Sequence, residues 1–198
     1  MEASEHLVLV VIDGLDASGK STQAVRLCKY LRNCGNNVCL RLHPSDDNFL
    51  GTETRKFLYL RGKSAHFAAA IFYMLDVVRS ILFFSWREYD YVIFVRYLMG
   101  TSYLPSPLFI VAYDFFASIV PMSDFMFFLD VTPKEAYRRI LQSRKRREMF
   151  ESLEELERIR RRALFSALSG KWTIINADKS IGDIEKEILK SLKLYKRA

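Results

Sequence analysis

The chain has 198 residues, 50% of them hydrophobic, a length that suits one domain with a substantial core and is too short for two. Its 30 Lys and Arg against 23 Asp and Glu give a formal net charge of +7, which favours a phosphorylated substrate or another polyanion. The three cysteines, Cys28, Cys34 and Cys39, match no common zinc spacing. The short apolar run after Glu2 and Glu5 is unlike a signal peptide. We therefore expect a single cytoplasmic domain over residues 1–198, with reduced thiols.

Apolar runs of strand length alternate with longer stretches that have the pattern of helices. The runs are LVLVVID, NVCLRL, YVIFV, FMFFLDV and WTIINA, and such runs are typical of parallel strands covered on both faces. The helices are expected at about 20–33, 66–86, 133–142 and 180–193, and two helices should flank the basic segment between 138 and 162. A further apolar stretch is broken by Asp114, Pro121 and Asp124 before it could cross a membrane. The alternation predicts an α/β fold with a parallel sheet.

The stretch GLDASGKS satisfies the phosphate-loop pattern G-x-x-x-x-G-K-[ST], directly after an expected strand and before an expected helix. Gly14 and Gly19 permit backbone conformations that turn successive N–H groups toward an anion. Lys20 supplies a cation to the β- and γ-phosphates, and the Ser21 hydroxyl is a ligand for Mg²⁺. The expected ATP-binding residues are Gly14, Leu15, Asp16, Ala17, Ser18, Gly19, Lys20, Ser21 and Thr22. No guanine-reading N-K-x-D segment is present, so a GTPase is not expected.

Six stretches along the chain share the motifs of one enzyme family. They are VVIDGLDASGKSTQAVRL, IFYMLDVVR, VRYLMGTSY, FFLDVTPKEAYRRI, RREMFE and IINADKSIGDI. They are spread along nearly the whole chain, and they resemble the thymidylate kinases, a family of phosphate-loop nucleoside monophosphate kinases. The resemblance implies a P-loop NTPase-type fold of five parallel strands with helices on both faces and a helical lid at about residues 142–152. It also implies a homodimer, for which the apolar segment 109–119 is a candidate surface.

The resemblance assigns roles to particular side chains. Arg96, at the end of the expected strand YVIFV, would bridge the donor and acceptor phosphates. Asp16 would meet the acceptor's sugar hydroxyl, and Phe72 would stack on its base, although a core phenylalanine is an equally good interpretation of Phe72. Arg144 and Arg147 would close over the phosphates from the lid, unless they form only a solvated basic face.

The chain departs from the family pattern at the metal site that the resemblance implies. Val95 stands where the family's Asp-Arg-Tyr element has its carboxylate. Asp130 also ends an apolar strand, so we treat it as a candidate replacement for the missing metal-site acid.

The acceptor side departs as well. Leu42 and His43 precede Pro44 where the family has an arginine, and Arg41 lies one position away from that site. Asp76 occupies the place of a second family arginine, with Arg79 nearly one helical turn on. We keep Arg41, His43 and Arg79 as candidate acceptor-binding residues. For His43 a surface position is the more common outcome.

These observations predict an ATP- and Mg²⁺-dependent kinase that phosphorylates dTMP or a related nucleotide-like acceptor. The alternative is an ATP-binding regulatory protein that descends from such a kinase and has little or no dTMP kinase activity. A nucleic-acid partner is not expected, because the basic residues cluster beside the phosphate loop and are accounted for there.

Overall fold

The structure is a computed structural model that describes residues 7–60, 63–83, 88–123, 125–143 and 152–194. Its elements in chain order are β1 Val8–Gly14, α1 Lys20–Asn33, β2 Val38–Leu42, α2 Phe49–Leu58, α3 Lys63–Phe83, β3 Tyr91–Val95, η2 Met99–Tyr103, α4 Leu108–Ile119, β4 Phe125–Asp130, α5 Pro133–Ser143, α6 Leu153–Ser169, β5 Trp172–Asn176 and α7 Ile181–Ser191. All five strand predictions are confirmed, and each lies within a residue or two of its expected bounds.

The five strands form one parallel sheet in the order β2-β3-β1-β4-β5. Strand β1 is therefore central, and its last residue, Gly14, lies in register with Leu129 of β4. On the other side Ile12 of β1 pairs with Val95 of β3. Because the strands are parallel, the phosphate loop after β1 and the segment after β3 leave the same edge of the sheet.

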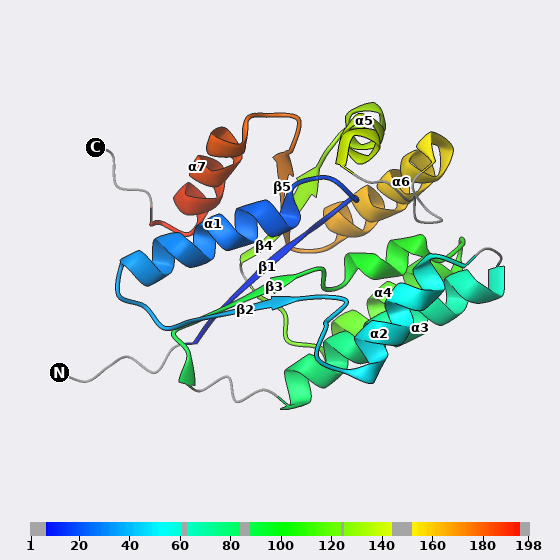
Figure 1. Ribbon diagram of the computed structural model, residues 1–198, viewed down its shortest axis with the longest axis horizontal. Helices are drawn as coiled ribbons and strands as arrows, with labels where there is room; N and C mark the ends of the chain where they lie inside the picture. Colours follow the sequence, from blue (N-terminus) through cyan, green and yellow to red (C-terminus); the bar gives the residue numbers. More distant parts are fainter. Residues whose placement is uncertain (1–6, 61–62, 84–87, 124, 144–151, 195–198) are drawn as a thin grey trace.

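Helices cover both faces of the sheet, as expected (Figure 1). Alternate strand residues point to opposite faces, so Val10 and Ile12 of β1 join α1 and α7 in one core cluster. Val11 points the other way and packs with residues of α3, α4 and α6. Because both faces of the parallel sheet are covered, the site is expected at its carboxyl edge.

Helix α2 was not predicted from the sequence, and it forms one wall of the site. It begins after Asn48, whose side-chain oxygen accepts a hydrogen bond from the Gly51 N–H at 3.1 Å. A Cβ on Gly51 would lie 2.0 Å from the carbonyl oxygen of Ser45. The absence of a side chain at Gly51 therefore allows α2 to lie against the loop that follows β2.

The expected lid falls mainly outside the described residues, and with it Arg144 and Arg147. The structure describes the flanking helices: α5 runs to Ser143 and α6 begins at Leu153. Ser152 caps α6 by accepting a hydrogen bond from the Glu155 N–H. Within the described part of the chain, none of the helices combines the length and the apolar character that crossing a membrane requires.

Candidate active site

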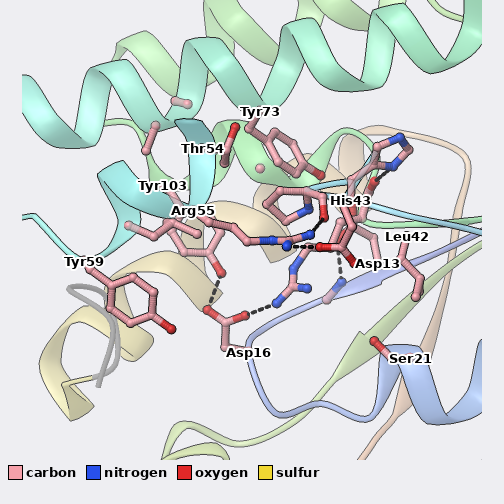
Figure 2. Close-up of a pocket in the computed structure, with 18 residues that line it drawn as sticks. Asp13, Asp16, Ser21, Leu42, His43, Thr54, Arg55, Tyr59, Tyr73 and Tyr103 are labelled. Carbon is pink, nitrogen blue, oxygen red and sulfur yellow. Dashed lines mark hydrogen bonds and ion pairs between the residues drawn. The ribbon is translucent and has the colours of Figure 1, made fainter. Parts of the chain in front are cut away.

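A pocket of about 300 Å³ opens at the carboxyl edge of the sheet, between the phosphate loop and helices α2 and α3 (Figure 2). That volume is at the lower end of the range for small-molecule sites. Its lining residues are Asp13, Gly14, Asp16, Ser21, Leu42, His43, Pro44, Asp46, Thr54, Arg55, Leu58, Tyr59, Ala69, Ala70, Tyr73, Arg96, Gly100 and Tyr103. Apolar side chains from α2 and α3 form one end, and acids and arginines gather at the other.

The phosphate loop has the backbone that its glycines predict. Gly14 has φ 147°, and a Cβ there would lie 2.4 Å from the Leu129 carbonyl oxygen, so only glycine fits against β4. Gly19 has φ 92° and leads directly into α1. The Lys20 ammonium donates to the carbonyl of Gly14 at 2.9 Å and to that of Leu15. The loop thus holds the Lys20 ammonium beside the N-terminus of α1, where proteins with a phosphate loop bind a phosphate.

The other expected ATP-binding residues are divided between the protein interior and the surface. Leu15, Asp16 and Ser18 are buried, and of these three only Asp16 lines the pocket. Ser21 and Thr22 are exposed on the first turn of α1, and Ser21 lines the pocket.

Asp16, Arg96 and Tyr103 form a cluster on the floor of the pocket (Figure 2). An Arg96 guanidinium N–H donates to Asp16 Oδ1 at 2.6 Å, and the Tyr103 hydroxyl donates to Asp16 Oδ2 at 2.9 Å. Burial alone would raise the pKa of Asp16, but the charges of Arg96 and Lys20 outweigh it and hold that pKa well below its usual range. The cluster therefore presents a carboxylate and a guanidinium together in the pocket.

A buried carboxylate that the sequence analysis did not select, Asp13, connects the phosphate loop to the segment after β3. Asp13 Oδ1 accepts from the Gly14 N–H at 2.9 Å, and Oδ2 accepts from Tyr97 N–H at 2.7 Å and Met99 N–H at 3.1 Å. Burial raises the pKa of Asp13, against the effect of these hydrogen bonds and of Lys20. Asp13 thus holds the main chain on either side of the pocket floor, and it also lines the pocket.

Arg55 of α2 is a second guanidinium in the pocket that sequence reasoning missed. It donates to the Pro44 carbonyl oxygen at 2.6 Å and pairs with Asp46. Helix α2 carries it above the pocket floor, facing the Asp16 cluster (Figure 2). The only property of the sequence that pointed to Arg55 was its distance along the chain from the loop after β2. That distance is informative only once residues 49–58 are known to form helix α2.

His43 is buried, with 1% of its surface exposed, so the surface position expected for it is wrong. Its Nδ1 lies 3.0 Å from the Arg96 carbonyl oxygen, and its Nε2 lies 2.9 Å from Ser80 Oγ. Arg41, two residues earlier on β2, shares that face of the strand and donates to Ser80 Oγ at 3.0 Å. Both Arg41 Nη groups bind the Asp47 carboxylate, at 2.7 and 2.8 Å.

Arg41 and Arg79 are not among the pocket-lining residues of the described chain. Both approach Asp47: Arg41 bonds it directly, and an Arg79 guanidinium nitrogen lies 3.9 Å from Asp47 Oδ1. Asp76, which stands in place of a family arginine, accepts from the Ser45 N–H at 2.7 Å and holds the loop after β2. The geometry therefore gives no support to Arg41 or Arg79 as acceptor ligands.

Phe72 faces α2 rather than the pocket, because it packs between two other phenylalanines. Its ring stacks on Phe57 at 5.5 Å and meets Phe49 edge-on at 6.2 Å. The neighbouring Tyr73 lines the pocket instead. Gly100 makes room for it, since a Cβ there would lie 2.1 Å from the Tyr73 ring. The stacking role expected for Phe72 is thus unsupported, and Tyr73 is one of the three tyrosines that line the pocket, with Tyr59 and Tyr103.

Asp130 is engaged by an arginine from α6. Arg160 donates to both carboxylate oxygens, at 2.7 and 2.8 Å. A carboxylate bound in this bidentate manner has its charge already compensated. The structure therefore does not support Asp130 as a metal ligand.

Arg139 of α5 reaches the phosphate loop from the other side. It donates to the Ala17 carbonyl at 3.2 Å and to the Ala177 carbonyl at 3.0 Å. This joins the loop to the segment after β5. Arg139 and its neighbour Arg138 both pair with Glu135, and no sequence signal separated the two arginines.

Comparison with known proteins places this arrangement in a family. The thymidylate kinase family profile matches residues 12–188. The chain belongs to the thymidylate kinase family. It is 28% identical to a probable thymidylate kinase of Methanococcus aeolicus, over 92% of this chain and 94% of that protein. It is 26% identical to the thymidylate kinase of Desulfotalea psychrophila, over 93% and 94% of the two chains.

The fold is also that of solved thymidylate kinase structures. The enzyme from Candida albicans superposes with a TM-score of 0.70 over 97% of this chain and 95% of that chain, at 19% identity. The enzyme from Ehrlichia chaffeensis gives 0.67 over 94% and 98%, also at 19% identity. The family resemblance and the fold class predicted from the sequence are thus confirmed, and thymidylate kinases are nucleoside monophosphate kinases that use ATP to phosphorylate dTMP.

Proposed function

We propose that the protein is an ATP-dependent kinase that transfers the γ-phosphoryl group to dTMP bound in the 300 Å³ pocket. One observation carries the proposal: Asp16 and Arg96 form a charged pair between the phosphate loop and the apolar end of that pocket. Phosphoryl transfer needs alignment and positive charge around the moving group rather than covalent chemistry. A guanidinium at the junction of the donor and acceptor sites supplies both.

The donor would bind to the loop Gly14–Thr22, with Lys20 as the cation for the β- and γ-phosphates. We propose that Arg144 and Arg147 complete the positive charge from the lid. Asp16 would accept a hydrogen bond from the acceptor's sugar, and the Tyr73 ring would bound the space for its base. Arg55 is the pocket cation best placed for the phosphate of dTMP. Its guanidinium could leave its ion pair with Asp46 and bind that phosphate instead.

Magnesium would be held at the exposed Ser21 hydroxyl, with Asp13, the pocket carboxylate directly before the loop, close by in sequence. The part of the chain that the structure describes has no cluster of three or more acidic, His or Cys side chains suited to a metal. This fits an ion that is bound mainly by nucleotide phosphates and water. When bound with ATP, Mg²⁺ supplies charge neutralisation at the β- and γ-phosphate oxygens.

A homodimer and a cytoplasmic location complete the proposal. Helix α3 exposes Phe67, Ile71 and Leu75 at successive turns, and α4 exposes Val111, Phe115 and Ile119 in the same way. Exposed apolar stripes of this kind favour burial against a second copy. The three cysteines are free, which suits a reducing compartment.

The test is ADP release from Mg²⁺-ATP in parallel reactions with dTMP, other nucleoside monophosphates, nucleosides and no acceptor. We expect dTMP to stimulate release strongly, and Lys20→Ala to abolish it in a protein that still folds. A rate that ignores every acceptor would contradict a kinase and favour the ATP-binding regulatory alternative. Stimulation by a different acceptor would retain the kinase and correct its substrate.

A further inference from the structure

Arg96 is held in a backbone conformation that side-chain-bearing residues rarely adopt. Its φ is 62°, in the left-handed region that costs about 1–3 kcal/mol for a residue other than glycine. Such a conformation persists only where the surroundings fix it from several sides. The Arg96 N–H donates to the Ile12 carbonyl at 3.1 Å, and the next N–H, of Tyr97, donates to Asp13 at 2.7 Å. The remaining main-chain group is the Arg96 carbonyl, which is bound by a side chain.

That side chain is His43, and the partners of its ring define which nitrogen carries the proton. A carbonyl oxygen can only accept, so the nitrogen 3.0 Å from it, Nδ1, is the donor. Nε2 then accepts from the Ser80 hydroxyl at 2.9 Å. Ser80 Oγ in turn accepts from Arg41 Nε at 3.0 Å. Burial, aided by Arg41 and opposed by Asp76, lowers the pKa of His43 to about 4, consistent with a neutral ring.

The chain of hydrogen bonds has one direction along its whole length. Arg41 donates to Ser80, Ser80 to His43, and His43 to the Arg96 carbonyl, while Asp47 anchors Arg41 with two hydrogen bonds. Arg41, His43 and Ser80 are all buried. Hydrogen bonds aligned in this way polarise one another and are stronger in a buried setting. The arrangement reaches from the loop after β2 to the backbone of the arginine at the pocket floor.

We propose that His43, held by Ser80 and Arg41, positions Arg96 for phosphoryl transfer by fixing its main-chain carbonyl. This inference rests on the proposed kinase function, in which the Arg96 guanidinium bridges the phosphates. His43 is in this account a positioning residue, because both of its ring nitrogens are engaged by protein groups and it acts through Arg96. Leu42, its neighbour, faces the other way from β2 and is exposed, so it takes no part in this network.

The test compares three substitutions at position 43 for kcat and for the ATP KM. H43L removes both hydrogen bonds and should lower kcat at least about tenfold, equivalent to ~1.4 kcal/mol, with the ATP KM changed less than about twofold. In H43N the side-chain amide can place an N–H near the Nδ1 position, whereas H43Q can reach only toward Ser80. We therefore expect H43N to keep more of the rate than H43Q. The reverse order would overturn the proposal, and this pair decides the matter even if H43L fails to fold.

A double substitution separates positioning from general structural damage. If His43 acts through Arg96, H43L should lower kcat no further in an R96A background, because the side chain being positioned is gone. An equal loss in both backgrounds would show that His43 works independently of Arg96 and would refute the inference. An inactive wild-type protein would refute the proposed function itself, whereas an active wild type with an equally active H43L would refute only the role of His43.

Discussion

The buried neutral His43 predicts a specific loss of stability in mild acid. Its pKa in the folded protein is lowered to about 4, against about 6.5 in an unfolded chain. For a base whose folded pKa is depressed, the unfolded state binds the proton first. The stability that His43 contributes is therefore fully present above about pH 6.5 and is lost as the pH falls toward 4.

The size of the effect follows from these two pKa values. Over the full range the loss is about 3 kcal/mol, and between pH 7 and pH 5 it is about 2 kcal/mol. Two charges face the ring and act in opposite senses: Asp76 on α3 favours the protonated form, and Arg41 on β2 disfavours it. Ser80, which accepts from Arg41, has its one proton directed at Nε2, so a second proton on the ring would break that hydrogen bond.

The measurement is urea-induced unfolding, followed by far-ultraviolet circular dichroism at pH 7, 6 and 5, for the wild type and H43N. Asparagine does not titrate, and every other acid and base is shared by the two proteins, so the difference between their free energies of unfolding isolates His43. We expect the wild-type advantage over H43N to shrink by about 2 kcal/mol from pH 7 to pH 5. Parallel pH profiles would refute the reasoning, because they would show that position 43 does not titrate between the two states.

Three further changes test other parts of the structure. Ala17 has φ 57°, so Ala17→Gly should raise the free energy of unfolding by roughly 0.5–1 kcal/mol by relieving left-handed strain, measured by urea unfolding; a loss of stability would mean that the loop imposes no strain there. Asp130→Asn should weaken the pair with Arg160 and lower stability by roughly 1–2 kcal/mol, while the Mg²⁺ concentration for half-maximal activity stays the same; a raised requirement would restore Asp130 as a metal-site acid. Arg55→Ala should raise the dTMP KM at least about tenfold with little change in the ATP KM, as expected for lost charge-assisted hydrogen bonds to a phosphate; equal changes in both constants would remove Arg55 from the acceptor site.

The strands and the phosphate loop could be predicted from the sequence because their signals are local. Each strand is a short apolar run, and the loop's glycines, lysine and serine stand within eight residues. That Asp16 and Arg96 lie at the same carboxyl edge follows from a parallel sheet, but the ion pair between them was not predicted. Local signals do not tell how a helix is rotated about its axis, and therefore which of its side chains face the site.

Phe72, for which the sequence left a stacking role and a core position equally open, shows this limit. Periodicity alone cannot choose between two adjacent aromatic residues on a helix as apolar as α3. The choice is made by α2, whose Phe49 and Phe57 enclose Phe72 and leave Tyr73 to line the pocket. Helix α2 escaped prediction because its short run, with Gly51 and Thr54 on the buried side, lacks a clear apolar stripe.

His43 illustrates a second limit, which concerns partners distant in sequence. A histidine after a strand is usually exposed, and nothing nearby in the sequence satisfies its two ring nitrogens. Its partners are Ser80, 37 residues on, and the carbonyl of Arg96, 53 residues on. Only the paired strands β2 and β3 and the packed helix α3 bring them together.

The last test concerns Val95, which stands where the Asp-Arg-Tyr element of the thymidylate kinase family has its carboxylate. It is fully buried among Ile12, Val10 and other apolar side chains, so Val95→Asp should destabilise the protein by about 3 kcal/mol or more, as an unpaired charge in an apolar cluster does. Val95→Thr, similar in shape and uncharged, is the control.

If Asp13 and Ser21 suffice for the metal, Mg²⁺-ATP should raise the melting temperatures of wild type, Val95→Asp and Val95→Thr by similar amounts. A distinctly larger increase for Val95→Asp would mean that the new carboxylate meets the ion and that the present site lacks a ligand. The protein would then have lost metal affinity at this position in exchange for a more apolar core.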